Sequence, residues 1–540
     1  MRNKAIRGLS LLAFLLAVVW VIVAQNFESA ITAIVLLVGF LSATWVTSEH
    51  LEKENDKRAV RGRPAPGLSG SVGLEGKSLL VLPLRTIQPD GSDDYLADGI
   101  TEEIIVDLSS IRTLRVISHA SALRLRGSDK TPAEIATDLG VGFVLEGSLR
   151  REGSVVRVNA RIVDVESGND VWADRFNGEL KSVLEIQQEV SAGIVRALAL
   201  SLDPGREVDA TQRFPEDPRA LEALLLGRHE LWGFSPESLR KAIKHLNNGL
   251  SVAGDHEALL ATLGQAFCQF AQLGDAESGQ YLAKATEVAD RIFAINPDSH
   301  HGHRLRGWVE FQSGHFRKAG PPLKKALEAD PSSPDTALML GYLLAMSGRM
   351  DSANALFDHV VSIDPLTPVS HTLQGAAAVL EGRFQDALPP YQRALELDPD
   401  SPFCQWTWSW ALTWNQRYEE ARDAMEKLVR DHPDSPFAPM AKSLSLGVSG
   451  RGQEAVEVLT TLALEEFSSN EMFSREIAHC FAIADRVDEA MIWIERNVQN
   501  GNINYPFLKD HDRFLDNLRP DPRFQELLNN VQRQWETFDL

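Results

Sequence analysis

Cysteine is scarce in this chain of 540 residues. The three cysteines, Cys268, Cys404 and Cys480, are odd in number, lie far apart and never form a C-x-x-C pair. This pattern excludes a disulfide framework and a cysteine-based zinc site. We therefore expect the three thiols to be small buried residues of a hydrophobic core.

Basic residues are outnumbered by acidic residues. Lys and Arg total 54 against 75 Asp and Glu, which gives a formal net charge of −21. Because binding to phosphates needs clustered Lys and Arg, this balance argues against nucleic acid as the main partner. The hydrophobic share of 44% is that of a globular protein with a full core, and the length allows two or more domains.

Motifs for catalysis and ligand binding are also missing. The sequence contains no G-x-S-x-G and no H-E-x-x-H. GKSLLVLP resembles the end of a phosphate-binding loop, but Ser71 stands where that motif needs its first glycine. His300, His301 and His303, with His315 nearby, lack convincing further metal ligands. We therefore predict no catalytic residue, no cofactor, no metal and no small-molecule substrate.

Charge is absent from two stretches near the N-terminus, residues 8–27 and 29–48. Each has twenty residues, about the length that spans a bilayer core of roughly 30 Å as a helix. Together they predict a transmembrane helical hairpin over residues 1–48. The alternative for the first stretch is a cleaved signal peptide, because Arg2, Lys4 and Arg7 precede it.

Lys and Arg flank this hairpin on both sides. After it come Lys53, Lys57, Arg58, Arg61 and Arg63, whereas the connecting loop has no Lys or Arg. The positive-inside rule therefore predicts a two-pass protein whose ends and large soluble part are cytoplasmic. A single crossing from an inside N-terminus would place the soluble part on the opposite side of the membrane.

A mixed pattern of strands and helices follows a linker at residues 49–77, which is first charged and then rich in Gly, Pro and Ser. SLLVLPL, LRVISH and FVLEGSLRREG predict strands, and residues 154–178 alternate apolar and polar residues as a hairpin does. YLADGITEEIIVDLSSI, TPAEIATDLG and SVLEIQQEVSAGIVRALALSL predict helices. We expect an α+β domain over residues 78–205, followed by a linker over 206–217.

Six carboxylates crowd the turn SDDYLADGITEEIIVDL at residues 92–108. One hypothesis is an acid/base or metal site. The other is a charged helix start, in which Asp98 is the N-cap and Glu102 and Glu103 occupy the first turn, where negative charge meets the positive helix end. The second hypothesis is favoured, because little else nearby resembles an acid/base pair.

A period of 34 residues runs through the second half of the chain. Pro297, Pro331, Pro365, Pro399 and Pro433 keep this spacing, as do alanines and glycines at fixed points, although Gln416 breaks the glycine series. A helix-turn-helix unit of this length is that of the tetratricopeptide repeat. We predict an all-α solenoid over residues 218–500 and a polar capping helix region over residues 501–540.

The phrases YLADGITEEIIVDLSSI, LRVISHASA, IATDLGVGFVLEGSLRREG and IVDVESGNDVWADRF together resemble the TolB amino-terminal-like domain. Bacteria often join that domain to tetratricopeptide repeats. The resemblance implies a bacterial inner-membrane protein, periplasmic if the membrane is crossed once. In such relatives a nucleotide cyclase or a winged-helix domain commonly precedes the TolB-like part, but only the hairpin and linker stand before Ser78 here, too little for either.

Aromatic residues recur at the helix positions that line the concave groove in tetratricopeptide repeats. In FCQWTWSWALTW three tryptophans share one helix face, while Trp408 falls at a packing position. We expect an exposed groove that captures an extended peptide or a partner helix, with ordinary inter-repeat packing as the alternative. The predicted groove residues are Trp308, Phe311, Tyr342, Met346, Trp406, Trp410, Trp414 and Met440.

The sequence thus predicts a non-enzymatic, membrane-anchored scaffold that binds another protein through its repeats. One alternative is a regulatory or sensory module that acts on a separate effector such as a nucleotide cyclase. A third hypothesis is an enzyme whose site lies in the α+β domain.

Overall fold

The computed structural model describes residues 77–87, 93–111, 113–179, 183–198, 214–232, 235–272, 278–460 and 471–540. The predicted hairpin of residues 1–48 and most of the linker after it lie outside this part of the chain. Within the described part, no helix is both long enough and apolar enough to span a bilayer.

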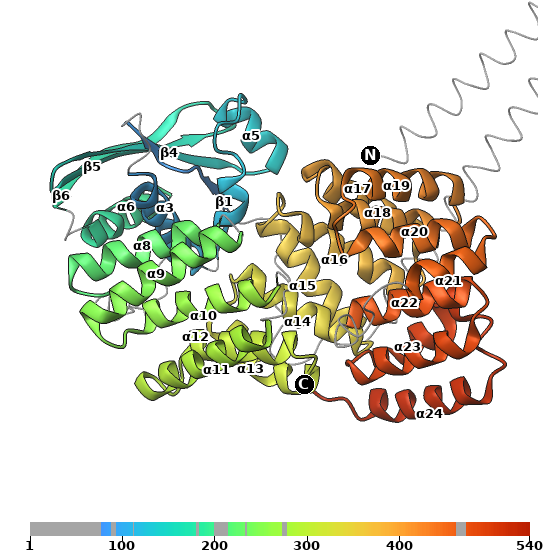
Figure 1. Ribbon diagram of the computed structural model, residues 1–540. Coiled ribbons are helices and arrows are strands. Elements are labelled where there is room, and N and C mark those ends of the chain that lie inside the picture. The colour runs from blue at the N-terminus through green and yellow to red at the C-terminus, as the bar shows by residue number, and fades with distance from the viewer. Residues whose placement is uncertain are drawn as a thin grey trace, which may run out of the picture. The chain divides into compact units, whose positions relative to one another are not determined.

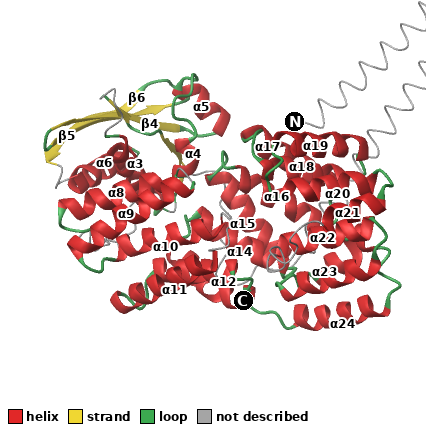
Figure 2. Cartoon of the chain, in the orientation of Figure 1, coloured by secondary structure: helices red, strands yellow, loops and turns green. Residues whose placement is uncertain are grey.

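The first described part is a mixed sheet with helices packed against it (Figures 1 and 2). Its six strands run in the order β3-β1-β4-β5-β6, with the short β2 beside β4; β1 is parallel to β3 and β4, and β4, β5 and β6 are antiparallel. The elements are β1 (Lys77–Val81), β2 (Arg85–Thr86), α3 (Asp94–Ser109), β3 (Leu114–Val116), α4 (His119–Leu123), α5 (Pro132–Leu139), β4 (Phe143–Glu152), β5 (Val155–Asp164), β6 (Asp170–Glu179) and α6 (Val183–Ala197). The predicted mixture of strands and helices is confirmed.

The remainder of the chain is a helical solenoid of antiparallel pairs. Pairs of the regular array begin at the Ser N-caps Ser299, Ser333 and Ser401, and the turns within the pairs contain a residue with a left-handed backbone. The helices are α8 (Pro218–Leu231), α9 (Pro236–Ala253), α10 (Glu257–Gln272), α11 (Ser278–Ile295), α12 (His300–Gln312), α13 (Phe316–Ala329), α14 (Pro334–Met346), α15 (Met350–Ile363), α16 (Pro368–Leu380), α17 (Phe384–Leu397), α18 (Pro402–Trp414), α19 (Tyr418–Asp431), α20 (Phe437–Val448), α21 (Gly452–Thr460), α22 (Glu471–Ile483), α23 (Val487–Gln499) and α24 (Pro522–Glu536). The three cysteines are free and buried, as predicted.

The sheet domain and the first solenoid helices share one hydrophobic core, which extends from Leu79 to Val309. The approach of α3 to α8 is close at Gly99, where an added Cβ would lie only 2.5 Å from the Leu225 side chain. A larger residue at position 99 would therefore require the Leu225 side chain to move.

The acid-rich turn differs from its prediction. The helix begins at Asp94 rather than after Asp98, because Tyr95, Leu96 and Ala97 are buried and extend the helical face by a turn. Asp98 is therefore an interior residue, not an N-cap, and it is 4% exposed. Burial alone would raise its pKa, but hydrogen bonds from His229 and Arg126 lower it below the usual range.

These carboxylates join the sheet domain to the solenoid. Asp98 Oδ2 lies 2.9 Å from His229 Nδ1, and Glu103 Oε1 lies 2.5 Å from Arg228 Nη1 on α8. The hydrogen bond that His229 donates to Asp98 also raises the pKa of His229. The acid-rich helix therefore acts as one half of an interdomain contact.

A second contact joins α4 to the turn after α15. Asp364, 2% exposed, accepts hydrogen bonds from the hydroxyls of Ser118 and Ser121 in the sheet domain, the latter at 2.6 Å, and from Thr367 in the solenoid. The Ser121 hydroxyl in turn accepts from the Leu366 amide at 2.9 Å. The sheet domain is thus fixed at two points that are far apart in the solenoid sequence.

Asp364→Ala tests this second contact. It leaves several buried hydroxyls without their acceptor, so we expect the free energy of unfolding to fall by about 2–4 kcal/mol. Urea unfolding measures the change. Asp358→Ala, an exposed carboxylate on the preceding helix, is the control and should cost less than about 0.5 kcal/mol. Equal effects of the two substitutions would contradict the contact.

Candidate functional site

The eight predicted groove residues lie on α12, α14, α18 and α20 and form what we call the aromatic face. Trp406, Trp410 and Trp414 are spaced four residues apart and follow one side of α18. The ring centroid of Trp410 lies 5.6 Å from that of Trp406 and 6.2 Å from that of Trp414. Phe311 stacks on Phe316 at 5.1 Å. The repeat register therefore brings these side chains to corresponding sides of successive helices.

The chain itself covers this face. Residues 502–515, the covering segment, follow α23 and pass along α14 and α18. Phe514 lies 4.3 Å from the Trp414 ring and 5.5 Å from the Trp410 ring, measured between centroids. The amide of Ile503 donates to the Met346 carbonyl at 2.9 Å, which satisfies a free carbonyl at the C-terminal end of α14.

Helix α22 completes the cover with polar side chains. Trp406 Nε1 donates to Glu476 Oε2 at 2.6 Å, and the Tyr342 hydroxyl donates to Glu471. His479, also on α22, lies 5.4 Å from the Trp410 ring and 2.9 Å from Asp512 Oδ2. Two side chains of α22, Glu471 and Glu476, thus accept hydrogen bonds from Tyr342 and Trp406.

The expectation of an exposed aromatic groove is therefore wrong. Six of the eight residues are buried, and Phe311 and Tyr342 are partly buried. Trp406 is 0% exposed, whereas Trp408, assigned to packing, is the more exposed of the two. The physical reason is that the first part of the C-terminal tail packs onto this face, where Phe507, Phe514 and their neighbours are buried. The polar capping helix that was expected for the tail is present only as α24.

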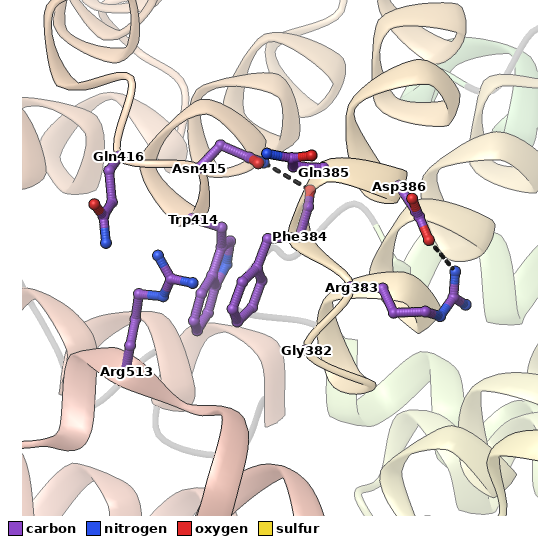
Figure 3. Close-up of a pocket in the computed structure, with 9 residues that line it drawn as sticks. All are labelled: Gly382, Arg383, Phe384, Gln385, Asp386, Trp414, Asn415, Gln416 and Arg513. Atoms are coloured by element: carbon purple, nitrogen blue, oxygen red, sulfur yellow. Dashed lines mark hydrogen bonds and ion pairs between the residues drawn. The ribbon is translucent and has the colours of Figure 1, made fainter. Parts of the chain in front are cut away.

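A notch stays open beside this cover, at the turns of two successive helix pairs (Figure 3). Its volume is about 430 Å³. It is lined by Gly382, Arg383, Phe384, Gln385, Asp386, Trp414, Asn415, Gln416 and Arg513. The guanidinium carbon of Arg513 lies 4.0 Å from the centroid of Phe384, and that ring stacks on Trp414 at 5.2 Å with 9° between planes.

The family described as tetratricopeptide repeat matches residues 310–377 and 378–443. These residues are tetratricopeptide repeats. A protein named putative adenylate cyclase 3, from Rhizobium meliloti (strain 1021), is 32% identical over 227 residues, which cover 42% of this chain and 39% of that protein. The chain thus spans about two fifths of the length of this relative.

Solved structures of tetratricopeptide repeat proteins are similar to part of the chain. A thermophilic repeat protein of Thermus thermophilus is 19% identical, with a TM-score of 0.30, over 36% of this chain and 99% of its own. YrrB, described as having an unusual peptide-binding site, is 21% identical, with a TM-score of 0.26, over 33% of this chain and 90% of its own. Likeness at this level concerns the fold of the repeats.

The tetratricopeptide repeats turn at a left-handed residue, and the notch lies at two such turns. Gly382 has φ +72°, and Gln416, at the corresponding position one repeat later, has φ +60°. A residue other than glycine, asparagine or aspartate in this conformation costs on the order of 1 kcal/mol. The break at Gln416 in the glycine series was thus a sequence signal for this site, whereas nothing in the repeat period indicated Arg513.

The other candidate groups are accounted for by structural contacts. Glu102 and Glu103 both face Arg228. His303 packs edge-on against Phe293, and His315 lies 2.8 Å from Glu310. Within the described residues, no three His, Cys, Asp or Glu side chains are grouped as a metal site would need.

Glu476 is the most perturbed carboxyl under the cover. Burial, together with nearby Glu471, raises its pKa from 4.5 to about 8, against the opposing effects of Arg475 and the hydrogen bond from Trp406. The folded protein therefore holds a proton here that the unfolded chain releases near pH 4.5. Its contribution to stability is complete below pH 4.5 and is lost as the pH rises through about 8.

Glu476→Gln, which keeps an oxygen for Trp406, tests this assignment. We expect the free energy of unfolding of the wild type, relative to the variant, to decline between pH 5 and pH 8 and then level off. Urea unfolding across this range measures the difference. The exposed Glu495→Gln on α23 should follow the wild type throughout, and a Glu476→Gln variant that does so too would contradict a protonated, buried Glu476.

Proposed function

We propose that the protein is a non-enzymatic, membrane-anchored scaffold that binds a protein partner at the open notch of its tetratricopeptide repeats. The observation that carries this proposal is the match of residues 310–443 to a repeat family whose architecture suggests protein–protein interaction. The notch supports it, because it offers a concave, partly aromatic surface on those same repeats.

Because the aromatic face is covered, we place the proposed partner contact at the notch beside it rather than along the face. A peptide that runs along the aromatic face would have to displace the covering segment and break its contacts to Trp410, Trp414 and Met346. A partner at the notch meets exposed side chains such as Gln385 and Gln416 without that cost. We therefore assign the predicted groove residues a supporting role beneath the cover.

Membrane attachment rests on the sequence of residues 1–63. Two uncharged stretches of twenty residues with Lys and Arg on their outer flanks support a two-pass anchor in a bacterial inner membrane. In this arrangement the repeats face the cytoplasm. The alternative, a single effective crossing, would place them in the periplasm.

A second candidate function is regulation of a separate nucleotide cyclase. The relative of Rhizobium meliloti named a putative adenylate cyclase favours it, because this chain corresponds to only part of that protein. In this version the partner at the notch is itself the effector. An enzyme with its site in the α+β domain has less support, because Asp98 and Glu103 each contact cationic side chains across the domain junction.

Site-specific photo-crosslinking in cells tests the scaffold. A photoreactive residue at Gln385 lies at the notch, and Gln453 is its equivalent two repeat periods later on α21. We expect the full chain to form a discrete protein adduct through position 385 and not through position 453, since only the former adjoins the notch. Mass spectrometry of the adduct decides between a cyclase and another partner.

Two results of the crosslinking experiment would count against a binding site at the notch. The absence of any protein adduct at position 385, with normal expression, would contradict binding at the notch. Identical adducts from both positions would indicate non-specific collision rather than a site.

A further inference from the structure

Arg513 lies at the notch, where it packs against an aromatic side chain of the repeats although it belongs to the covering segment. Its guanidinium is 4.0 Å from the centre of the Phe384 ring, which in turn stacks on Trp414. Figure 3 shows the three groups side by side, with the guanidinium edge turned toward the open side near Gln416. A guanidinium packed against an aromatic ring loses little further freedom when it forms hydrogen bonds.

The charge of Arg513 is not compensated by the described residues. No carboxylate among them lies within ion-pair distance of its guanidinium, and Arg513 is partly buried. Arg383 on the same notch differs, because Glu381 and Asp386 bind it at 2.6 and 2.9 Å. Asp386, the carboxylate that lines the notch, is thus occupied by Arg383, and among the described residues Arg513 is the cation of the notch without an ion pair.

We propose that this notch binds the carboxylate of an acidic side chain on the protein partner, with Arg513 as its bidentate ligand. The inference rests on the proposed function and adds the chemistry of the contact. A planar guanidinium fork matches the two oxygens of a carboxylate. A phosphate, with up to two negative charges, is matched less well by a site with one unpaired cation.

The overall charge of the chain restricts the kind of partner segment that can bind at the notch. At −21 the protein repels acidic proteins at long range. A partner that reaches this notch therefore carries its acidic residue within a neutral or basic segment. The expected ligand is one glutamate or aspartate flanked by lysine, arginine or apolar residues.

Peptide binding to the full-length chain tests the inference. The probe is a set of synthetic peptides that contain one glutamate between leucine and lysine residues, and its control is the same set with glutamine. Ligand-observed NMR should detect at least tenfold tighter binding of the glutamate peptides, because a charge-assisted pair contributes more than a neutral one. Arg513→Gln should remove this preference, and Arg383→Gln, whose charge is already neutralised, should change it less than twofold.

Phe384→Leu is a second variant, which retains the charge of Arg513 but removes the aromatic ring against which its guanidinium packs. We expect Phe384→Leu to weaken the preference for glutamate about threefold to tenfold. Arg513→Gln and Phe384→Leu should both keep the wild-type melting temperature within about 2 °C. Equal binding of glutamate and glutamine peptides, or a preference that survives Arg513→Gln, would overturn the inference. Competition by acetate at the concentration of the peptide would also overturn it, since the notch would then be a small-anion site.

Failure of this inference is distinguishable from failure of the proposed function. A photo-adduct at position 385 without any preference for glutamate leaves the scaffold standing and removes the carboxylate contact. Absence of the adduct contradicts the scaffold itself, whatever the peptides do.

Discussion

The burial of one face of a repeat array by the chain's own tail is the constraint on which the rest of this structure depends. Each tryptophan side chain removes about 150–250 Å² from water, worth roughly 4–6 kcal/mol at 25 cal/mol per Å². Trp406, Trp410 and Trp414 obtain this burial from α22, Phe507 and Phe514. Exposed in water, the same stripe would be a large apolar patch prone to association.

Closure of the face also determines where charge can lie. Glu471, Arg475 and Glu476 are carried into the interior on α22. Glu471 accepts hydrogen bonds from Tyr342 and Arg475, and Glu476 accepts one from Trp406. At the edge, Arg513 belongs to the covering segment but reaches the turns of the repeats. The open notch is thus lined by the repeats and, through Arg513, by their cover.

The parts of the fold that depend on local sequence were predictable. A 34-residue period, Pro and Ser at helix starts and glycine at the turns all follow from contacts within a repeat or between neighbours. Alternating residues likewise identified the β5–β6 hairpin. The same local reasoning placed Trp410 and Trp414 correctly on one helix face.

The errors arose where residues distant in sequence meet. Asp98 pairs with His229, and Tyr342 with Glu471, across more than a hundred residues, and no period or spacing records such contacts. The N-cap assigned to Asp98 failed because burial of Tyr95 and Leu96 extended the helix upstream. The groove was expected to be open because its aromatic residues fall at the helix positions that line the concave groove in tetratricopeptide repeats. The covering segment, whose apolar residues are interrupted by Asn, Asp and Lys, gave no sequence signal that it would bury them.

Hydrogen–deuterium exchange of the full-length chain tests the closed face most directly. The amide of Ile503 donates to Met346, and that of Asp512 donates to Phe507, within a segment that would exchange rapidly if it lay free in water. Closure predicts that peptides spanning residues 502–515 exchange as slowly as those of α14 and α18. Exchange of this segment within seconds, alongside protected repeat helices, would contradict it.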